Sequence, residues 1–116
     1  RAACSCRRAH MEYLAYVTAP SMDEARRLAR MLVEKKLAAG VNVVPGAWSV
    51  YRWQGKICEA GECLLLAQVS QEALPDFQQA VLAEHSYELP CIVALPLEGH
   101  APFLRWIAEN SRARDF

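Results

Sequence analysis

Three segments of the sequence combine strand-forming residues with apolar side chains at both odd and even positions. They are Tyr13 to Thr18 (YLAYVT), Cys63 to Val69 (CLLLAQV) and Cys91 to Leu97 (CIVALPL). Successive residues of a strand point to opposite faces of the sheet, so such strands need cover above and below. Each Leu or Val left exposed forgoes about 1.5–3 kcal/mol. Whatever fold the chain adopts must therefore cover both faces of its sheet.

Helices are expected between these strands. Ser21 and Glu24 have the spacing of a capping box, in which the two side chains satisfy backbone N–H groups at a helix start reciprocally. Pro75 suits the first turn of a second helix, where a missing N–H is harmless. The expected elements are a strand over 13–18, a helix from 21 that ends before 40, strands over 41–53 and 57–70, a helix over 74–85, a strand over 91–97, a short helix from 102, and a polar end over 110–116 that frays.

The two central strands are expected to form a hairpin. Gln54-Gly55 lies between them and suits a tight turn, because glycine accepts a positive φ. Pro45-Gly46 indicates a bend or an edge position in the first of these strands, and Gly61 suggests a bulge in the second. A hairpin over 49–57 is long for a chain of this size, so we expect it to reach a neighbouring molecule and protect its sheet edge.

The order strand, helix, strand, strand, helix, strand, with one more helix at the end, predicts an α+β fold. It is the ferredoxin-like split βαβ arrangement (βαββαβ), with both long helices on one face of a four-stranded antiparallel sheet. The other face would then face water, although the strands have no polar side. An apolar surface of this size usually marks an interface, so a further copy of the chain is expected to cover it.

Composition narrows the class of protein. The 116 residues suggest one domain over 11–116, preceded by a tag, a leader or a disordered tail over 1–10. The formal net charge is zero, which argues against nucleic acid as a partner, and no apolar run is long enough to span a membrane. Five cysteines, an odd number, favour a reducing, cytoplasmic location over a disulfide framework. None of the common catalytic motifs is present, so no enzyme activity is expected.

Six stretches in register resemble the CutA divalent-cation tolerance family. They are VTAP (17–20), LVEKKLAAGVN (32–42), SVYRWQGKI (49–57), EHSYELP (84–90), IVALPL (92–97) and FLRW (103–106). The resemblance implies a ferredoxin-like fold in a tight homotrimer, a link to tolerance of copper and other divalent cations, and no defining catalytic reaction. Animal relatives are associated with the anchoring of acetylcholinesterase.

The sequence departs from the family pattern where a metal ligand would matter. Gly40 stands where these proteins commonly have cysteine, Ser86 replaces a proline and Cys91 replaces a glutamate. The resemblance therefore leaves His85 alone of a proposed Cys/Cys/His ion site. One imidazole does not hold a transition metal tightly, because further ligands are needed.

The candidate site is centred on the segment EHSYELP. Metal ligands are expected at His85 first, then Glu88 and Glu59, and a crevice between subunits is expected to use Tyr87 with Trp53 and Lys56 of a neighbouring hairpin. The alternative is structural: His85 caps the helix and Tyr87 packs at a subunit boundary.

These observations predict a non-enzymatic homotrimer that takes part in divalent-cation tolerance, binds Cu²⁺ weakly if at all, and requires no cofactor. One alternative is a signalling trimer comparable to PII proteins, with a small anion or metabolite near Lys56, His85 and Tyr87. Another is a scaffold that anchors a partner protein. Cys58, Glu59, Glu62 and Cys63 look like a metal cluster, but Cys58 and Cys63 face opposite sides of a regular strand unless Gly61 forms a bulge.

Overall fold

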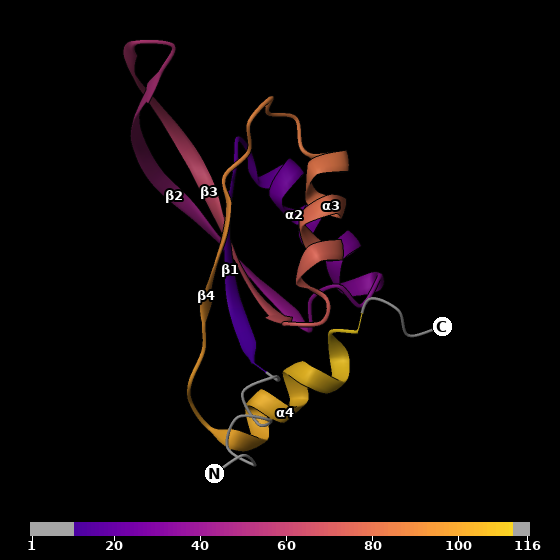
Figure 1. The fold of residues 1–116 in the computed structure, drawn as a ribbon. Coiled ribbons are helices and arrows are strands. Elements are labelled where there is room, and N and C mark those ends of the chain that lie inside the picture. Colours follow the sequence, from indigo (N-terminus) through magenta and orange to yellow (C-terminus); the bar gives the residue numbers. More distant parts are fainter. Residues whose placement is uncertain (1–10, 113–116) are drawn as a thin grey trace.

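A computed structural model describes residues 11–112 of the chain (Figure 1). The prediction for residues 1–10 falls outside this range. The elements are β1 (Glu12–Ala19), α2 (Met22–Glu34), β2 (Gly40–Trp53), β3 (Lys56–Ser70), α3 (Leu74–Glu84), β4 (Ile92–Pro96) and α4 (Ala101–Asn110). Within the described residues no helix combines the length and the apolar character needed to cross a membrane. The predicted order of strands and helices is confirmed.

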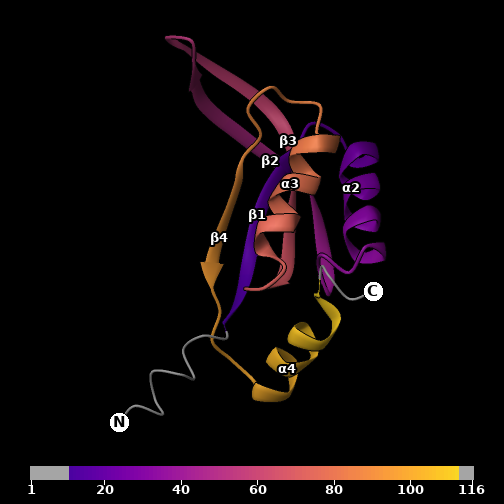
Figure 2. The same ribbon diagram turned by 45° about the vertical axis from the view of Figure 1, so that its right-hand side comes forward.

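The four strands form one antiparallel sheet in the order β2-β3-β1-β4. The helices α2 and α3 lie side by side on one face of this sheet, as both ribbon views show (Figures 1 and 2). The helix α4 lies at one end of the sheet, beyond the ends of α2 and α3 (Figure 2). This is the predicted split βαβ arrangement, and α2 and α3 leave the second face of the sheet uncovered, apart from Trp106 of α4 beside Gly40.

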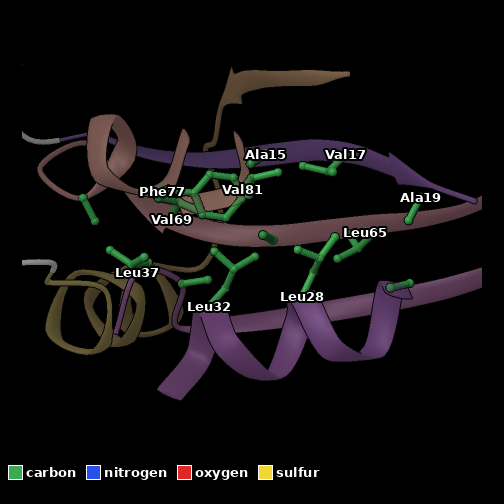
Figure 3. Close-up of a cluster of buried hydrophobic side chains, with 14 of the residues drawn as sticks. Ala15, Val17, Ala19, Leu28, Leu32, Leu37, Leu65, Val69, Phe77 and Val81 are labelled. Carbon is green, nitrogen blue, oxygen red and sulfur yellow. The ribbon is translucent and has the colours of Figure 1, made fainter. Parts of the chain in front are cut away.

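The core lies between the sheet and the two long helices. Its largest fully buried side chains include Phe77, Leu28, Leu32 and Leu65 (Figure 3). In α2, the spacing of three or four residues between Ala25, Leu28 and Leu32 directs one stripe of the helix toward the sheet. The strands contribute their odd-numbered residues over the same layer: Ala15, Val17 and Ala19 from β1, and Cys63, Leu65, Ala67 and Val69 from β3.

The even-numbered residues of β1 and β3 form the opposite face, which we call the open face. Its rows follow the strand register: Asn42, Leu66, Tyr16 and Val93 lie across the sheet from one another, and so do Gln68, Leu14 and Leu95. Val93 is 53% exposed and Leu95 is 59% exposed in the single chain. The sequence predicted apolar side chains on both faces of the sheet, and the structure confirms it.

The strands β2 and β3 continue past the body of the molecule as a hairpin arm (Figures 1 and 2). Gln54 and Gly55 have φ values of 52° and 80°, the two positive values that a type I′ turn requires. The register shifts between Val44 and Ala47, where β2 has one more residue than β3. The bulge is therefore at Pro45-Gly46 in β2. The predicted bulge at Gly61 is wrong, since Gly61 pairs regularly with Trp48.

The start of α2 uses only half of the predicted capping box. The Ser21 hydroxyl oxygen accepts a hydrogen bond from the Glu24 N–H at 3.2 Å. The Glu24 carboxylate, however, accepts the N–H of Ser86 at 2.9 Å, 62 residues further along the chain. Glu24 has the spacing of a capping residue, but its carboxylate makes a long-range contact instead.

The two residues that follow α4 are hydrogen-bonded to the rest of the fold and are not frayed. Ser111 is fully buried, its hydroxyl oxygen accepts the Ser70 N–H at 2.9 Å, and the hydroxyl donates to the Leu37 carbonyl at 2.9 Å. The Arg112 N–H donates to the Lys36 carbonyl at 2.7 Å. The expectation of a frayed end from residue 110 is therefore wrong for Ser111 and Arg112, and residues 113–116 lie outside the described range.

Replacing Ser111→Ala is expected to lower the free energy of unfolding by about 1–3 kcal/mol. The change leaves the Ser70 N–H and the Leu37 carbonyl buried without this partner. Urea unfolding at one protein concentration measures the effect. Asn110→Ala serves as the control, because it removes an exposed bond within α4 and should cost about 0.5 kcal/mol or less. Equal losses in the two variants would contradict the role given to Ser111.

Candidate functional site

A cavity of about 660 Å³ opens where the hairpin arm leaves the sheet. The segment that follows α3 forms one wall, the hairpin forms another, and the end of β1 forms the floor. The lining residues are Tyr16, Thr18, Ser49, Val50, Tyr51, Trp53, Glu62, Ser86, Tyr87, Glu88, Leu89 and Cys91. Since Tyr16, Thr18 and Glu62 lie at even positions of β1 and β3, the cavity is at one end of the open face.

His85 lies directly behind this cavity and ends α3. Its side chain is fully buried, and its Nε2 lies 2.7 Å from the Thr18 carbonyl oxygen. Its Nδ1 accepts the Tyr87 N–H at 3.0 Å. A carbonyl only accepts and an N–H only donates, so these partners assign the neutral ring with the proton on Nε2. Both ring nitrogens are thereby occupied by the backbone.

Tyr87 follows with its ring against His85, at a centroid distance of 4.9 Å. Its hydroxyl donates to Glu62 Oε2 at 2.7 Å. Burial, followed by the hydrogen bond and the negative charge of Glu62, raises the pKa of Tyr87 far above its ordinary value. Burial and the charge of Glu62 also raise the pKa of the Cys91 thiol. Glu62 therefore makes this cavity unfavourable for further negative charge.

The segment after α3 is attached to the first turns of α2. Glu24 Oε2 accepts the Ser86 N–H and lies 3.5 Å from His85 Nδ1. Burial alone would raise the pKa of Glu24, but the hydrogen bonds from Ser86 and the positive charge of Arg27 outweigh it, so the pKa is lowered. Arg27 also reaches Glu84 at 3.3 Å. These contacts fix the wall of the cavity to the helix layer.

The structure does not gather the three predicted metal ligands. Glu88 lines the cavity. His85 is buried, and both of its ring nitrogens are hydrogen-bonded to backbone groups. Glu59 lies on the other face of the hairpin arm, where its carboxylate accepts the Trp48 indole N–H at 2.8 Å. Across residues 11–112, no three His, Cys, Asp or Glu side chains are grouped to hold a metal ion. The metal site stays a prediction, and the contacts of His85 favour the alternative of a structural cap.

Two of the three predicted crevice residues do line the cavity. Trp53 and Tyr87 both line it within one chain. Lys56 is exposed, next to the turn of the hairpin arm, and does not line it. The contribution of Trp53 and Lys56 from a neighbouring hairpin to a crevice between subunits stays a prediction. Tyr51 and Glu62 also line the cavity; the sequence favoured strand packing over a ligand cage for Tyr51 and suggested Glu62 only as part of a metal cluster. The regular register of β3 places Cys58 and Cys63 on opposite faces, which removes that cluster.

Gly40 is tightly surrounded. A Cβ added there would lie 2.7 Å from Gln68 Oε1 and 3.3 Å from the Trp106 ring. A cysteine at this position would therefore require Gln68 to move. This part of the open face is instead occupied by an amide and an indole, neither of which is a good ligand for a soft metal.

Comparison with known proteins identifies clear relatives. The family described as CutA1 divalent ion tolerance protein matches residues 13–110. The divalent-cation tolerance protein CutA of Thermus thermophilus is 47% identical over 102 residues, which cover 87% of this chain and 99% of that protein. Protein CutA of Homo sapiens is 40% identical over 96 residues, but these cover only 54% of its length.

Solved structures agree with the sequence comparison. The structure of the Thermus thermophilus protein has a TM-score of 0.85, covering 87% of this chain and 99% of that chain. A structure described as PII-like protein CutA from Nostoc sp. PCC 7120 is 27% identical, with a TM-score of 0.81 over 87% of this chain and 98% of that chain.

Proposed function

Since this chain belongs to the CutA1 divalent ion tolerance protein family, we propose that it acts as a non-enzymatic homotrimer in the tolerance of divalent cations such as copper. A cytoplasmic location accompanies this proposal. The thiols of Cys58, Cys63 and Cys91 are free, as suits a reducing compartment.

One observation carries the proposed assembly. The open face presents Leu66, Val93 and Leu95 in adjacent rows, and no helix of the described chain covers them. Monomeric proteins rarely expose an apolar surface of this extent. The hairpin arm adds Trp48, Val50 and Ile57, each more than 60% exposed. Burial of both surfaces against further copies accounts for side chains that nothing in one chain covers. Sizing of the parent and one variant, described in the Discussion, tests it.

Copper binding is expected to be weak. A variant of His85 tests whether this side chain is a copper ligand or a structural cap. His85→Ala should lower the free energy of unfolding by about 1–3 kcal/mol, because the Thr18 carbonyl and the Tyr87 N–H lose their partner. Any Cu²⁺ affinity should be unchanged, since neither nitrogen of His85 is available as a ligand. Calorimetric titration and urea unfolding measure the two effects.

The titration is best made on the chain from Met11 onward, since Cys4, Cys6 and His10 offer copper ligands of their own. Glu88→Gln is the matched variant, because Glu88 is exposed beside the cavity. If His85→Ala abolished Cu²⁺ binding at unchanged stability, His85 would be a ligand and the structural assignment would be wrong.

A second candidate function is small-molecule signalling of the PII type. The observation that favours it is the cavity of about 660 Å³, whose volume lies in the range of small-molecule sites. The likeness to a protein described as PII-like agrees with it. A thermal-shift screen in the presence of a metal chelator separates this function from cation tolerance. Stabilisation by a metabolite without metal would support signalling.

A further inference from the structure

The chemistry of the cavity points to one class of ligand. Two carboxylates line it, those of Glu62 and Glu88, and none of its lining residues is Lys, Arg or His. Aromatic rings make up much of the rest of the wall, with Tyr51 and Trp53 on the hairpin arm and Tyr16 on β1. The faces of such rings attract cations, most strongly where water is excluded. An anion finds no positively charged partner here.

Two neighbours of Glu62 are disfavoured as anions. The Tyr87 hydroxyl, 2.7 Å from Glu62 Oε2, and the Cys91 thiol are both disfavoured as anions by burial and by this carboxylate. Tyr87 therefore stays a neutral hydrogen-bond donor to Glu62. The same field that opposes a phenolate or a thiolate in the cavity stabilises a positive charge placed there.

The geometry points to this cavity as a binding site for a small organic cation of the ammonium class, held by Glu62 and Glu88 and enclosed by the aromatic rings. A bare divalent ion is the poorer fit, because such ions need three or more ligands and no group of that kind exists in residues 11–112. The inference goes beyond the proposed role in divalent-cation tolerance. It uses neither His85 nor Glu59, and it can fail while that role stands.

Choline and its uncharged isostere 3,3-dimethyl-1-butanol are suitable probes, because they differ in the charged nitrogen and little in shape. Calorimetric titration of the full chain, with a metal chelator present throughout, should give a choline Kd in the millimolar range or below. The isostere should bind at least about tenfold more weakly, since it gains nothing from the carboxylates or the rings. Quenching of Trp fluorescence by choline should be lost in Trp53→Phe.

Glu62→Gln is the decisive variant. An amide oxygen can still accept the Tyr87 hydroxyl, so the wall is kept while the charge is removed. Choline binding should fall at least about tenfold, as expected for the loss of one ion pair in a partly enclosed site. Glu98→Gln removes an exposed carboxylate outside the cavity and should change nothing. Equal binding of both probes, full binding by Glu62→Gln, or no choline binding because a neighbouring copy fills the cavity would each overturn the inference.

Discussion

A Val93→Lys variant is expected to be a monomer of 13.0 kDa under conditions in which the parent chain is expected to sediment as a trimer. Val93 lies in the middle row of the open face and is 53% exposed in one chain, so a lysine there has room and leaves the core intact. In the assembly each copy loses burial worth about 1.5–3 kcal/mol. The buried, unpaired ammonium costs several kcal/mol more.

The change should appear in sedimentation or in light scattering at micromolar concentration, with a far-ultraviolet circular dichroism spectrum that stays unchanged. Leu82→Lys is the matched control, because Leu82 is 51% exposed on α3, away from the open face, and this variant should remain a trimer. A trimeric Val93→Lys protein would show that the open face is not the interface. A monomeric parent would contradict the proposed assembly altogether.

The second large effect is expected in the core. Phe77→Ala should lower the free energy of unfolding by about 3–5 kcal/mol, because the ring is fully buried between α3 and the sheet and leaves a cavity that the close-packed neighbours fill only in part. A loss of this size is a large fraction of the stability of a small domain. Urea unfolding at matched protein concentration measures it, since the proposed assembly would make the transition depend on concentration.

Phe103→Ala provides the comparison with the same chemistry at the surface. Phe103 is 47% exposed on α4 and contacts Trp106 at a centroid distance of 5.1 Å. Loss of this pair should cost about 0.5–1.5 kcal/mol. If the two phenylalanine variants were equally destabilised, the buried cluster around Phe77 would not be the main source of stability.

The sequence was sufficient for the order of elements and for the existence of the open face. Both follow from signals within a few residues: the turn at Gln54-Gly55, the helix start at Ser21, and strands such as 13–18 with no polar side. The conclusion that both helices share one face needed only the handedness of the crossovers. Local chemistry and chain geometry therefore decided the fold.

The candidate site was harder to predict from the sequence than the fold, because it depends on contacts between distant segments. Glu24 has the spacing of a capping residue, and only the fold shows that its carboxylate binds Ser86. His85 resembles a metal ligand in sequence, but its nitrogens are taken by Thr18 and Tyr87. A surplus residue at Pro45-Gly46 decides which side chains of β2 join Glu62, whereas the sequence suggested only a bend or an edge position there and placed a bulge at Gly61.

That surplus residue also governs how the arm can vary in length. Before it, Asn42 and Val44 point to the open face, and after it Ser49, Tyr51 and Trp53 do. Because side chains alternate along a strand, the bulge takes up one residue without changing which side chains face the cavity: deleting Gly46 alone would leave Ser49, Tyr51 and Trp53 on that side, whereas one residue inserted after Ala47 would turn Tyr51 away from it. Insertions that add one residue to each strand near the tip would preserve every lining residue. Natural variation in arm length is thus expected at the bulge or as matched additions at the tip, and not as single residues elsewhere in either strand.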